Sequence, residues 1–352
     1  MTKVLVTGGT GYIGSHTVVE LQQEGFEVII VDNLCNSNIE VLNGIEKITG
    51  IRPMFENIDC TDYINMDRMF EKYQNIKAII HFAALKAVGE SVEKPLIYYR
   101  NNLVSLINLL QLMPIHKIKN LVFSSSCTVY GQPDVLPVKE DTPFKPALSP
   151  YGNTKQICEE IIRDTIHANP NLYRSIVLRY FNPIGAHPSA EIGELPIGVP
   201  NNLLPFITQT AIGIRKQLLV YGNDYNTPDG TCIRDYIDVV DLAKAHVIAL
   251  KRMLKQQQKT NLEVFNLGTG RGLSVLEIIK TFEKVNGVKV PYKIVGRRPG
   301  DIEKVWADPS LANKELGWKA ERTLEETLRS AWEWEKKLAS RAKEKDHTKT
   351  ES

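Results

Sequence analysis

The stretch KVLVTGGTGYIG, residues 3–14, decides the fold of this chain. Its first five residues are mostly apolar and β-branched, which predicts a buried strand. Glycines follow in the spacing G-x-x-G-x-x-G, at Gly8, Gly11 and Gly14. An amphipathic stretch then leads to a second apolar run, residues 28–31, which ends in Asp32. Strand, glycine turn, helix, strand and acid in this order predict a dinucleotide-binding βαβ unit.

Each residue of this pattern has a physical reason. Gly8 and Gly11 let the backbone turn tightly and approach a pyrophosphate, and Gly14 lets the helix pack close to the sheet. The free N–H groups at the helix N-terminus can bind phosphate oxygens. Asp32 can accept hydrogen bonds from an adenosine ribose, and its charge would repel a 2′-phosphate. We therefore predict NAD, and not NADP, as the cofactor. A plain structural βα turn is the alternative, and the complete context weighs against it.

Composition places the chain among ordinary globular proteins. Its 352 residues suffice for a large α/β domain and a second lobe. The 43 basic and 41 acidic residues give a net charge of +2, so no global field points to nucleic acid or a membrane. No apolar run approaches the ~20 residues of a membrane span. The five cysteines are scattered without a C-x-x-C pair. We expect reduced thiols, no metal site, no signal peptide before the first strand and a cytoplasmic location.

Strands and helices alternate through the first half, which predicts a doubly wound parallel sheet of the Rossmann type. Proline, acid or glycine signals place helix starts after Gly11, Asp62, Pro95 and Pro150. The predicted strands are Lys3–Thr7, Glu27–Val31, Met54–Ile58, Ala78–Phe82, Asn120–Ser124 and Ser175–Tyr180.

The pattern changes after Tyr180, where prolines crowd a segment with few periodic runs. We predict a NAD-binding domain over residues 1–180 and a smaller, loop-rich lobe, mainly for substrate, over residues 181–340. Segments of this lobe are expected to return to the sheet, and the apolar run at residues 264–267 is the candidate strand. Residues 341–352 are charged and polar, which predicts a frayed tail.

Tyr151 and Lys155 stand four residues apart at the start of a predicted helix, so both lie on one face. A lysine ammonium beside a phenol lowers the phenol pKa, which would let Tyr151 take a proton from a substrate hydroxyl. Ser124, Ser125 and Ser126 end a predicted strand, and one of them can share a hydrogen bond with that hydroxyl. A Y-x-x-x-K pair alone is usually a solvated helix face. Together with the glycine turn and the serines it predicts an active site.

From residue 3 to about residue 320 the chain resembles the extended short-chain dehydrogenases/reductases, and within them the UDP-glucose 4-epimerases. Matching segments include VLVTGGTGYIGSH (4–16), SSSCTVYG (124–131), SPYGNTK (149–155) and RRPGD (297–301). The most specific segments for the epimerases are LKAVGES (85–91) and RYFN (179–182).

This resemblance implies reversible C4 epimerisation of UDP-glucose and UDP-galactose through a 4-keto sugar, with hydride held transiently on tightly bound NAD. It implies that Tyr151 is the base, that Ser126 hydrogen-bonds the sugar 4-oxygen, and that Lys155 holds the nicotinamide ribose and tunes Tyr151. It also implies a homodimer with a UDP-hexose as substrate.

The resemblance further assigns binding residues. Residues expected at the cofactor are Gly8, Gly11, Tyr12, Ile13, Gly14, Asp32, Asn33, Asn36, Ser37, Asp59, Cys60, Phe82, Ala83, Ala84, Lys86, Asn101, Ser124, Tyr151, Lys155, Tyr180 and Phe181. Residues expected at the substrate are Ser126, Tyr151, Asn182, Asn202, Tyr221, Arg234, Arg298, Asp301 and Val305. In this set the arginines suit a diphosphate, because guanidinium binds phosphate as a fork.

Val305 stands where some members of the family have tyrosine. Our hypothesis is that the smaller residue widens the sugar pocket and admits UDP-GlcNAc and UDP-GalNAc. Three other functions remain as alternatives: a sugar 4,6-dehydratase, a plain dehydrogenase and a non-catalytic NAD-sensing protein. The dehydratases carry acidic residues after the serine of the strand end, whereas this chain has Cys127 and Thr128. A binding protein often loses the tyrosine or the lysine, and this chain keeps both.

Overall fold

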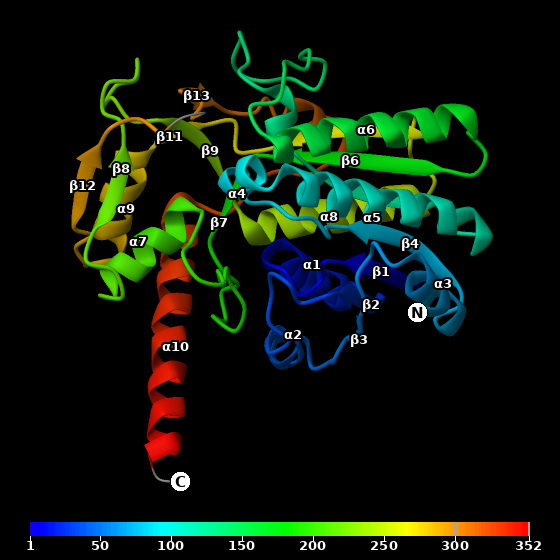
Figure 1. Ribbon diagram of the computed structural model, residues 1–352, viewed down its shortest axis with the longest axis horizontal. Helices are drawn as coiled ribbons and strands as arrows, with labels where there is room; N and C mark the ends of the chain where they lie inside the picture. The colour runs from blue at the N-terminus through cyan, green and yellow to red at the C-terminus, as the bar shows by residue number, and fades with distance from the viewer. Residues whose placement is uncertain (299–300, 351–352) are drawn as a thin grey trace.

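A parallel seven-stranded sheet forms the centre of the computed structural model, which describes residues 1–298 and 301–350 (Figure 1). Its strand order is β10-β6-β5-β4-β1-β2-β3, which confirms the predicted doubly wound arrangement. The strands are β1 (Lys3–Thr7), β2 (Glu27–Asp32), β3 (Met54–Asn57), β4 (Ile76–His81), β5 (Asn120–Ser126), β6 (Arg174–Tyr180) and β10 (Leu262–Leu267). The predicted strands fall within one or two residues of these bounds.

Helices cover both faces of this sheet. They are α1 (Tyr12–Gln23), α2 (Val41–Thr49), α3 (Tyr63–Lys72), α4 (Val88–Glu93), α5 (Pro95–Ile115), α6 (Pro150–Ala168) and α8 (Val239–Leu254), with a 3₁₀ turn η1 (Cys127–Tyr130) and a π-helical turn η2 (Ala312–Leu316). Val4 and Val6 pack in one apolar cluster with α1, α2 and α8, whereas Leu5 packs in another with α3, α5 and α6. Because both faces are buried, the strands are almost continuously apolar.

A second lobe stands beside the carboxyl end of the sheet (Figure 1). Its elements are β7 (Asn182–Ile184), α7 (Leu203–Ala211), β8 (Leu218–Tyr221), β9 (Ile233–Asp238), β11 (Gly272–Ser274), α9 (Val275–Asn286), β12 (Tyr292–Val295), β13 (Lys304–Val305) and α10 (Leu324–Thr350). β9 pairs with β7, β11 and β13, while β8 pairs with β12. Its own core includes Ile207, Ile278, Phe282 and Leu328, each 0% exposed.

The chain returns from this lobe to the central sheet, as expected for residues 264–267. β10 pairs with β6 in parallel register, with Val264 opposite Val177. The boundary at residue 180 stays a prediction.

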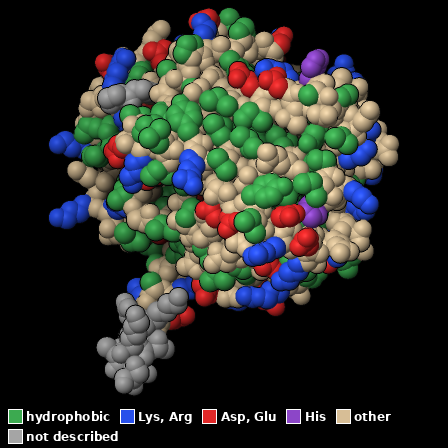
Figure 2. Space-filling model, turned by 45° about the vertical axis from the view of Figure 1, so that its right-hand side comes forward, with side chains coloured by type: hydrophobic (Ala, Val, Ile, Leu, Met, Phe, Trp, Pro, Cys, Tyr) green, Lys and Arg blue, Asp and Glu red, His purple; other side chains and the backbone are tan. Residues whose placement is uncertain are grey.

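The polar end of the chain differs from the expected frayed tail. Residues 341–350 continue α10, and residues 351–352 lie outside the described part. Arg341 forms an ion pair with Glu191 on the second lobe. On the face drawn in Figure 2 the two signs of charge are interspersed. Within the described residues, no helix is long and apolar enough to cross a membrane.

Candidate active site

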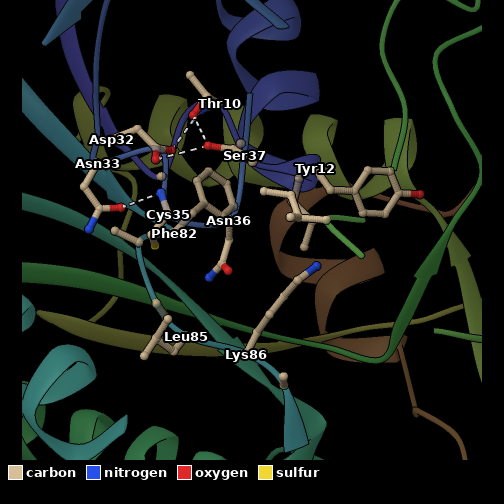
Figure 3. A pocket seen from close by; sticks show the side chains of 18 of the residues that line it. Thr10, Tyr12, Asp32, Asn33, Cys35, Asn36, Ser37, Phe82, Leu85 and Lys86 are labelled. Atoms are coloured by element: carbon tan, nitrogen blue, oxygen red, sulfur yellow. Dashed lines mark hydrogen bonds between the residues drawn. The ribbon is translucent and has the colours of Figure 1, made fainter. Parts of the chain in front are cut away.

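A cavity of about 540 Å³ opens where β1 and β4 end, at the point where the strand order reverses. Ligands of doubly wound sheets bind at this point, outside the carboxyl ends of the strands. The cavity is bounded by the glycine turn, the segment after β4 and residues 193–202 of the second lobe. Figure 3 shows the side chains of Asp32, Phe82 and Lys86 around it.

The glycine turn approaches its neighbours too closely for any other residue. A Cβ on Gly14 would lie 2.2 Å from the Gly8 carbonyl oxygen. Gly8 has a φ of +70°, and a Cβ there would lie 2.7 Å from the Ala83 nitrogen. Gly11 caps α1 without a side-chain hydrogen bond. The cradle and the helix N-terminus therefore fit the pyrophosphate of a dinucleotide.

Asp32 ends β2 at the wall of this cavity and is 9% exposed. Its carboxylate accepts hydrogen bonds from the Thr10 nitrogen at 3.2 Å, the Leu34 nitrogen at 2.9 Å and the Ser37 hydroxyl at 3.3 Å. Figure 3 shows Asp32 beside Thr10 and Ser37. Asn33 donates to Asp59 at 3.0 Å beside it. The acid is thus held rigidly, as a ribose acceptor needs to be.

The cavity brings together most of the residues expected at the cofactor. They are Gly8, Gly11, Tyr12, Ile13, Gly14, Asp32, Asn33, Asn36, Ser37, Asp59, Cys60, Phe82, Ala83, Ala84, Lys86, Asn101, Tyr151, Lys155 and Tyr180. Ser124 and Phe181 do not line it. The Ser124 hydroxyl donates to the Tyr180 hydroxyl at 3.2 Å, and Phe181 is 3% exposed in an apolar cluster with Val305.

Tyr151 and Lys155 lie on α6 at the inner end of the cavity, beside the end of β5. Burial raises the pKa of Tyr151 well above its usual value, and a hydrogen bond with Ser126 acts in the opposite direction. Lys155 donates instead to the Ser124 carbonyl oxygen at 2.8 Å, and burial lowers its own pKa. Burial is the largest influence on the Tyr151 pKa and raises it, so the lowering expected from Lys155 stays a prediction.

A buried ion pair ties α6 to the sheet behind this group. Arg179 and Glu159 are separated by 2.6 Å, and both side chains are at most 8% exposed. Ser125 donates to Glu159 at 2.5 Å, and Arg179 donates to the Tyr130 hydroxyl at 2.8 Å. Ser149 caps α6 by accepting from the Gly152 nitrogen at 3.1 Å. These contacts fix the helix that carries Tyr151 relative to β5.

The residues expected at the substrate do not all lie together. Asn202 and Tyr151 both line the cavity. Ser126 forms a hydrogen bond with Tyr151. Arg298, Asp301 and Tyr221 gather in the second lobe: Arg298 forms an ion pair with Asp301 at 2.8 Å and stacks over the Tyr221 ring. Arg234 on β9 donates to the Ile233 carbonyl oxygen. Asn182 begins β7, and Val305 is 3% exposed in the cluster with Phe181.

Thr10 and Glu194 are among the cavity residues with polar contacts that the sequence interpretation missed. Thr10 lines the cavity and exchanges a hydrogen bond with Ser37 at 2.7 Å. Glu194 lines it from the second lobe, accepts from Asn202 at 2.5 Å and lies 3.9 Å from the Lys86 ammonium. Thr10 stands inside the glycine turn, so the motif could have indicated it. Glu194 stands in a proline-rich loop without periodicity, which offered no signal.

No group of three or more His, Cys, Asp or Glu side chains that could hold a metal ion occurs in the described part of the chain. The sheet order, the glycine turn and the Tyr151–Lys155 pair beside Ser126 define an extended short-chain dehydrogenase/reductase.

Comparisons with known proteins are more specific. The family model described as GDP-mannose 4,6 dehydratase matches residues 5–331. The UDP-glucose 4-epimerase of Bacillus subtilis (strain 168) is 52% identical over 332 residues, which cover 94% of this chain and 96% of the relative. That of Homo sapiens is 50% identical over 344 residues, 96% and 97% of the two chains. The chain belongs to the UDP-glucose 4-epimerase family.

Solved structures agree with this assignment. The crystal structure of UDP-glucose 4-epimerase from Bifidobacterium longum in complex with NAD⁺ and UDP has a TM-score of 0.91 and 50% identity, and the match covers 96% of this chain and 98% of that one. The crystal structure of UDP-glucose 4-epimerase from Brucella ovis in complex with NAD has a TM-score of 0.86 and 39% identity. The match covers 94% of this chain and 98% of that one.

Proposed function

We propose that this protein interconverts UDP-glucose and UDP-galactose with NAD as its bound cofactor. One observation carries the proposal: Tyr151, in contact with Ser126, lies in the same cavity as the glycine turn and Asp32. A proton-transfer group and a dinucleotide cradle thus share one cavity. Relatives with about half of their residues identical along nearly the whole chain are named for this reaction.

The roles of the chain's own residues follow from this arrangement. Tyr151 takes the proton of the sugar 4-hydroxyl and returns it, and Ser126 hydrogen-bonds the same oxygen. NAD, when bound, supplies a reversible hydride acceptor for C4 of the sugar. Lys155, together with the N-terminal end of α6, favours the phenolate form of Tyr151 once the site is filled. The Arg179–Glu159 pair keeps α6 in place while the proton moves.

The substrate binds between the two lobes in this proposal. Arg234 and Arg298 bind the diphosphate, because each offers a planar fork of donors. Asp301 accepts from the uridine ribose and Tyr221 lies at the uracil. Asn182 and Asn202 donate amide hydrogens to phosphate or sugar.

We further propose that UDP-GlcNAc and UDP-GalNAc are accepted, because Val305 is smaller than the tyrosine of some relatives. Val305 belongs to an apolar cluster and does not line the cavity. Its smaller side chain therefore widens the sugar pocket only through the residues that pack between it and the cavity. Turnover of UDP-galactose without turnover of UDP-GlcNAc would contradict this part of the proposal.

A homodimer and a cytoplasmic location belong to the same proposal. Leu96, Ile97 and Ile107 on α5 are 81%, 55% and 37% exposed, and this apolar surface suits pairing with a second copy. All five cysteines are free, as is typical of a reducing compartment.

A 4,6-dehydratase is the second candidate, because the matching family model bears that description. Its elimination step needs an acid and a base directly after the serine of β5. The residues at that place form η1 and begin with Cys127 and Thr128, which carry no carboxylate. The site therefore favours epimerisation.

The deciding experiment incubates the purified protein with UDP-galactose and no added NAD, and separates the products by chromatography. Formation of UDP-glucose without net NADH supports both the reaction and the retained cofactor. Absence of product, with NAD supplied as well, would contradict the proposal, and a 4-keto product would favour the dehydratase.

A further inference from the structure

Glu194 is a carboxylate in a cavity that we assign to two anionic ligands. It lies between β7 and α7, and its side chain is 13% exposed. Burial raises its pKa, while Lys86 and the hydrogen bond from Asn202 lower it. A buried carboxylate beside phosphate groups is unfavourable unless it has partners. The contacts of Glu194 should therefore show why a carboxylate stands in the cavity wall.

The contacts of Glu194 join the two halves of the site. The Asn202 amide donates to its Oε1 at 2.5 Å, and the Lys86 ammonium lies 3.9 Å from the same oxygen. Lys86 follows β4 and lines the cavity (Figure 3). Asn202 caps α7 in the second lobe. Glu194 thus holds a side chain that we assign to the substrate and one that we assign to the cofactor.

The backbone of Glu194 is fixed from outside the cavity. The Trp334 indole on α10 donates to its carbonyl oxygen at 2.9 Å. A Cβ on Gly193 would lie 2.5 Å from the indole ring, so the segment packs directly against Trp334. Glu194 therefore has a rigid support, which a residue that orients others needs.

We infer that Glu194 is a positioning residue that orients the Asn202 amide toward the sugar nucleotide. The inference rests on the proposed function, since Asn202 is assigned to the substrate there. Without the carboxylate, the Asn202 side chain can turn among several rotamers, and ordering it again on binding weakens affinity. The chemical step at Tyr151 does not involve Glu194. Its loss therefore acts on KM more than on kcat.

The test is a double-mutant cycle on the full-length protein, with Glu194→Ala, Asn202→Ala and the double variant. KM and kcat for UDP-galactose are measured, and UDP binding is measured by calorimetry. We expect Glu194→Ala to raise KM about tenfold and to weaken UDP binding similarly, with kcat changed less than about threefold. In the Asn202→Ala background the same replacement is expected to change KM less than about twofold.

Two further variants separate positioning from general structure. Glu194→Gln keeps an oxygen that can accept from Asn202, so we expect it to restore KM to within about threefold of the wild-type value. Glu191→Gln is the matched control, because Glu191 lies on the same segment and pairs with Lys337 and Arg341. It does not line the cavity, so its KM is expected to be unchanged.

The outcomes distinguish this inference from the proposed function. Additive effects of the two alanine replacements on UDP binding, or an unchanged KM in Glu194→Ala, would overturn the positioning role. So would a failure of Glu194→Gln to restore KM. A wild-type protein that binds UDP but converts no UDP-galactose would contradict the proposed function, while the binding cycle would still decide the role of Glu194.

Discussion

Asp32 and Arg298 are both charged residues that we assign to nucleotide binding, but their surroundings differ. Asp32 is 9% exposed, and three donors hold its carboxylate. The Arg298 side chain is 57% exposed and forms an ion pair with Asp301, three residues away. The part of the site formed by the glycine turn and Asp32, which we call the cofactor end, is thus preformed by backbone and buried contacts. The part formed by Arg298 and Asp301, which we call the substrate end, keeps its charges paired with each other. A diphosphate must therefore compete with Asp301 for Arg298.

The largest effect is expected at the inner end of the cavity. Tyr151→Phe removes the proton acceptor, so we expect kcat to fall by about 10³ to 10⁴-fold, the upper range for general-base groups. The variant is expected to retain bound NAD, which extraction and absorbance measure. Activity within tenfold of the wild type would rule out Tyr151 as the base.

Gly14→Ala tests whether the cofactor end is preformed. The new Cβ would lie 2.2 Å from the Gly8 carbonyl oxygen, so either α1 or the turn must move. We expect loss of most bound NAD and a destabilisation of roughly 1–3 kcal/mol, as is typical of overpacking. Gly89→Ala is the control, because a Cβ there has no neighbour within 4 Å. Equal NAD content in both variants would contradict a close-fitting cradle.

Arg298→Ala tests the substrate end. A hydrogen bond to a charged group contributes about 1.5–3 kcal/mol, so KM for UDP-galactose is expected to rise about 10- to 100-fold with NAD content unchanged. Arg297→Ala is the matched control, since Arg297 pairs with Asp224 and stacks over Tyr225. Loss of NAD from Arg298→Ala would show that the two ends are not independent.

The smallest expected effect is on the pH dependence of folding stability, and it arises from the buried residue His246. His246 is 0% exposed, packs against Phe82 and has a pKa lowered to about 4 by burial. The unfolded chain binds the proton more readily, so stability is lost as pH falls below 6.5. Between pH 6 and pH 5 we expect the wild type to lose about 1 kcal/mol more than His246→Phe in urea unfolding. His167 is exposed, so the His167→Gln variant is expected to lose as much stability between pH 6 and pH 5 as the wild type does.

Local sequence was enough to predict the cofactor end, because the strand, turn, helix and acid lie within residues 3–32. The Tyr151 environment could not be predicted in the same way. Its pKa depends on burial, and Lys155 turns to the Ser124 carbonyl oxygen, 31 residues away in sequence. Glu194 was missed although Asn202 is close to it in sequence, because two of its other partners, Lys86 and Trp334, lie more than 100 residues away on either side.

The sheet around which this site forms is completed late in the chain. β6 ends at Tyr180, but its partner strand β10 ends at Leu267, and α8, which covers one face, ends at Leu254. On the ribosome, the chain must therefore carry an unpaired apolar strand edge for about 90 residues of synthesis, on the order of 5–20 s. Such an edge is a template for wrong pairing. Slower translation through this interval would lengthen the time for which the edge of β6 stays unpaired.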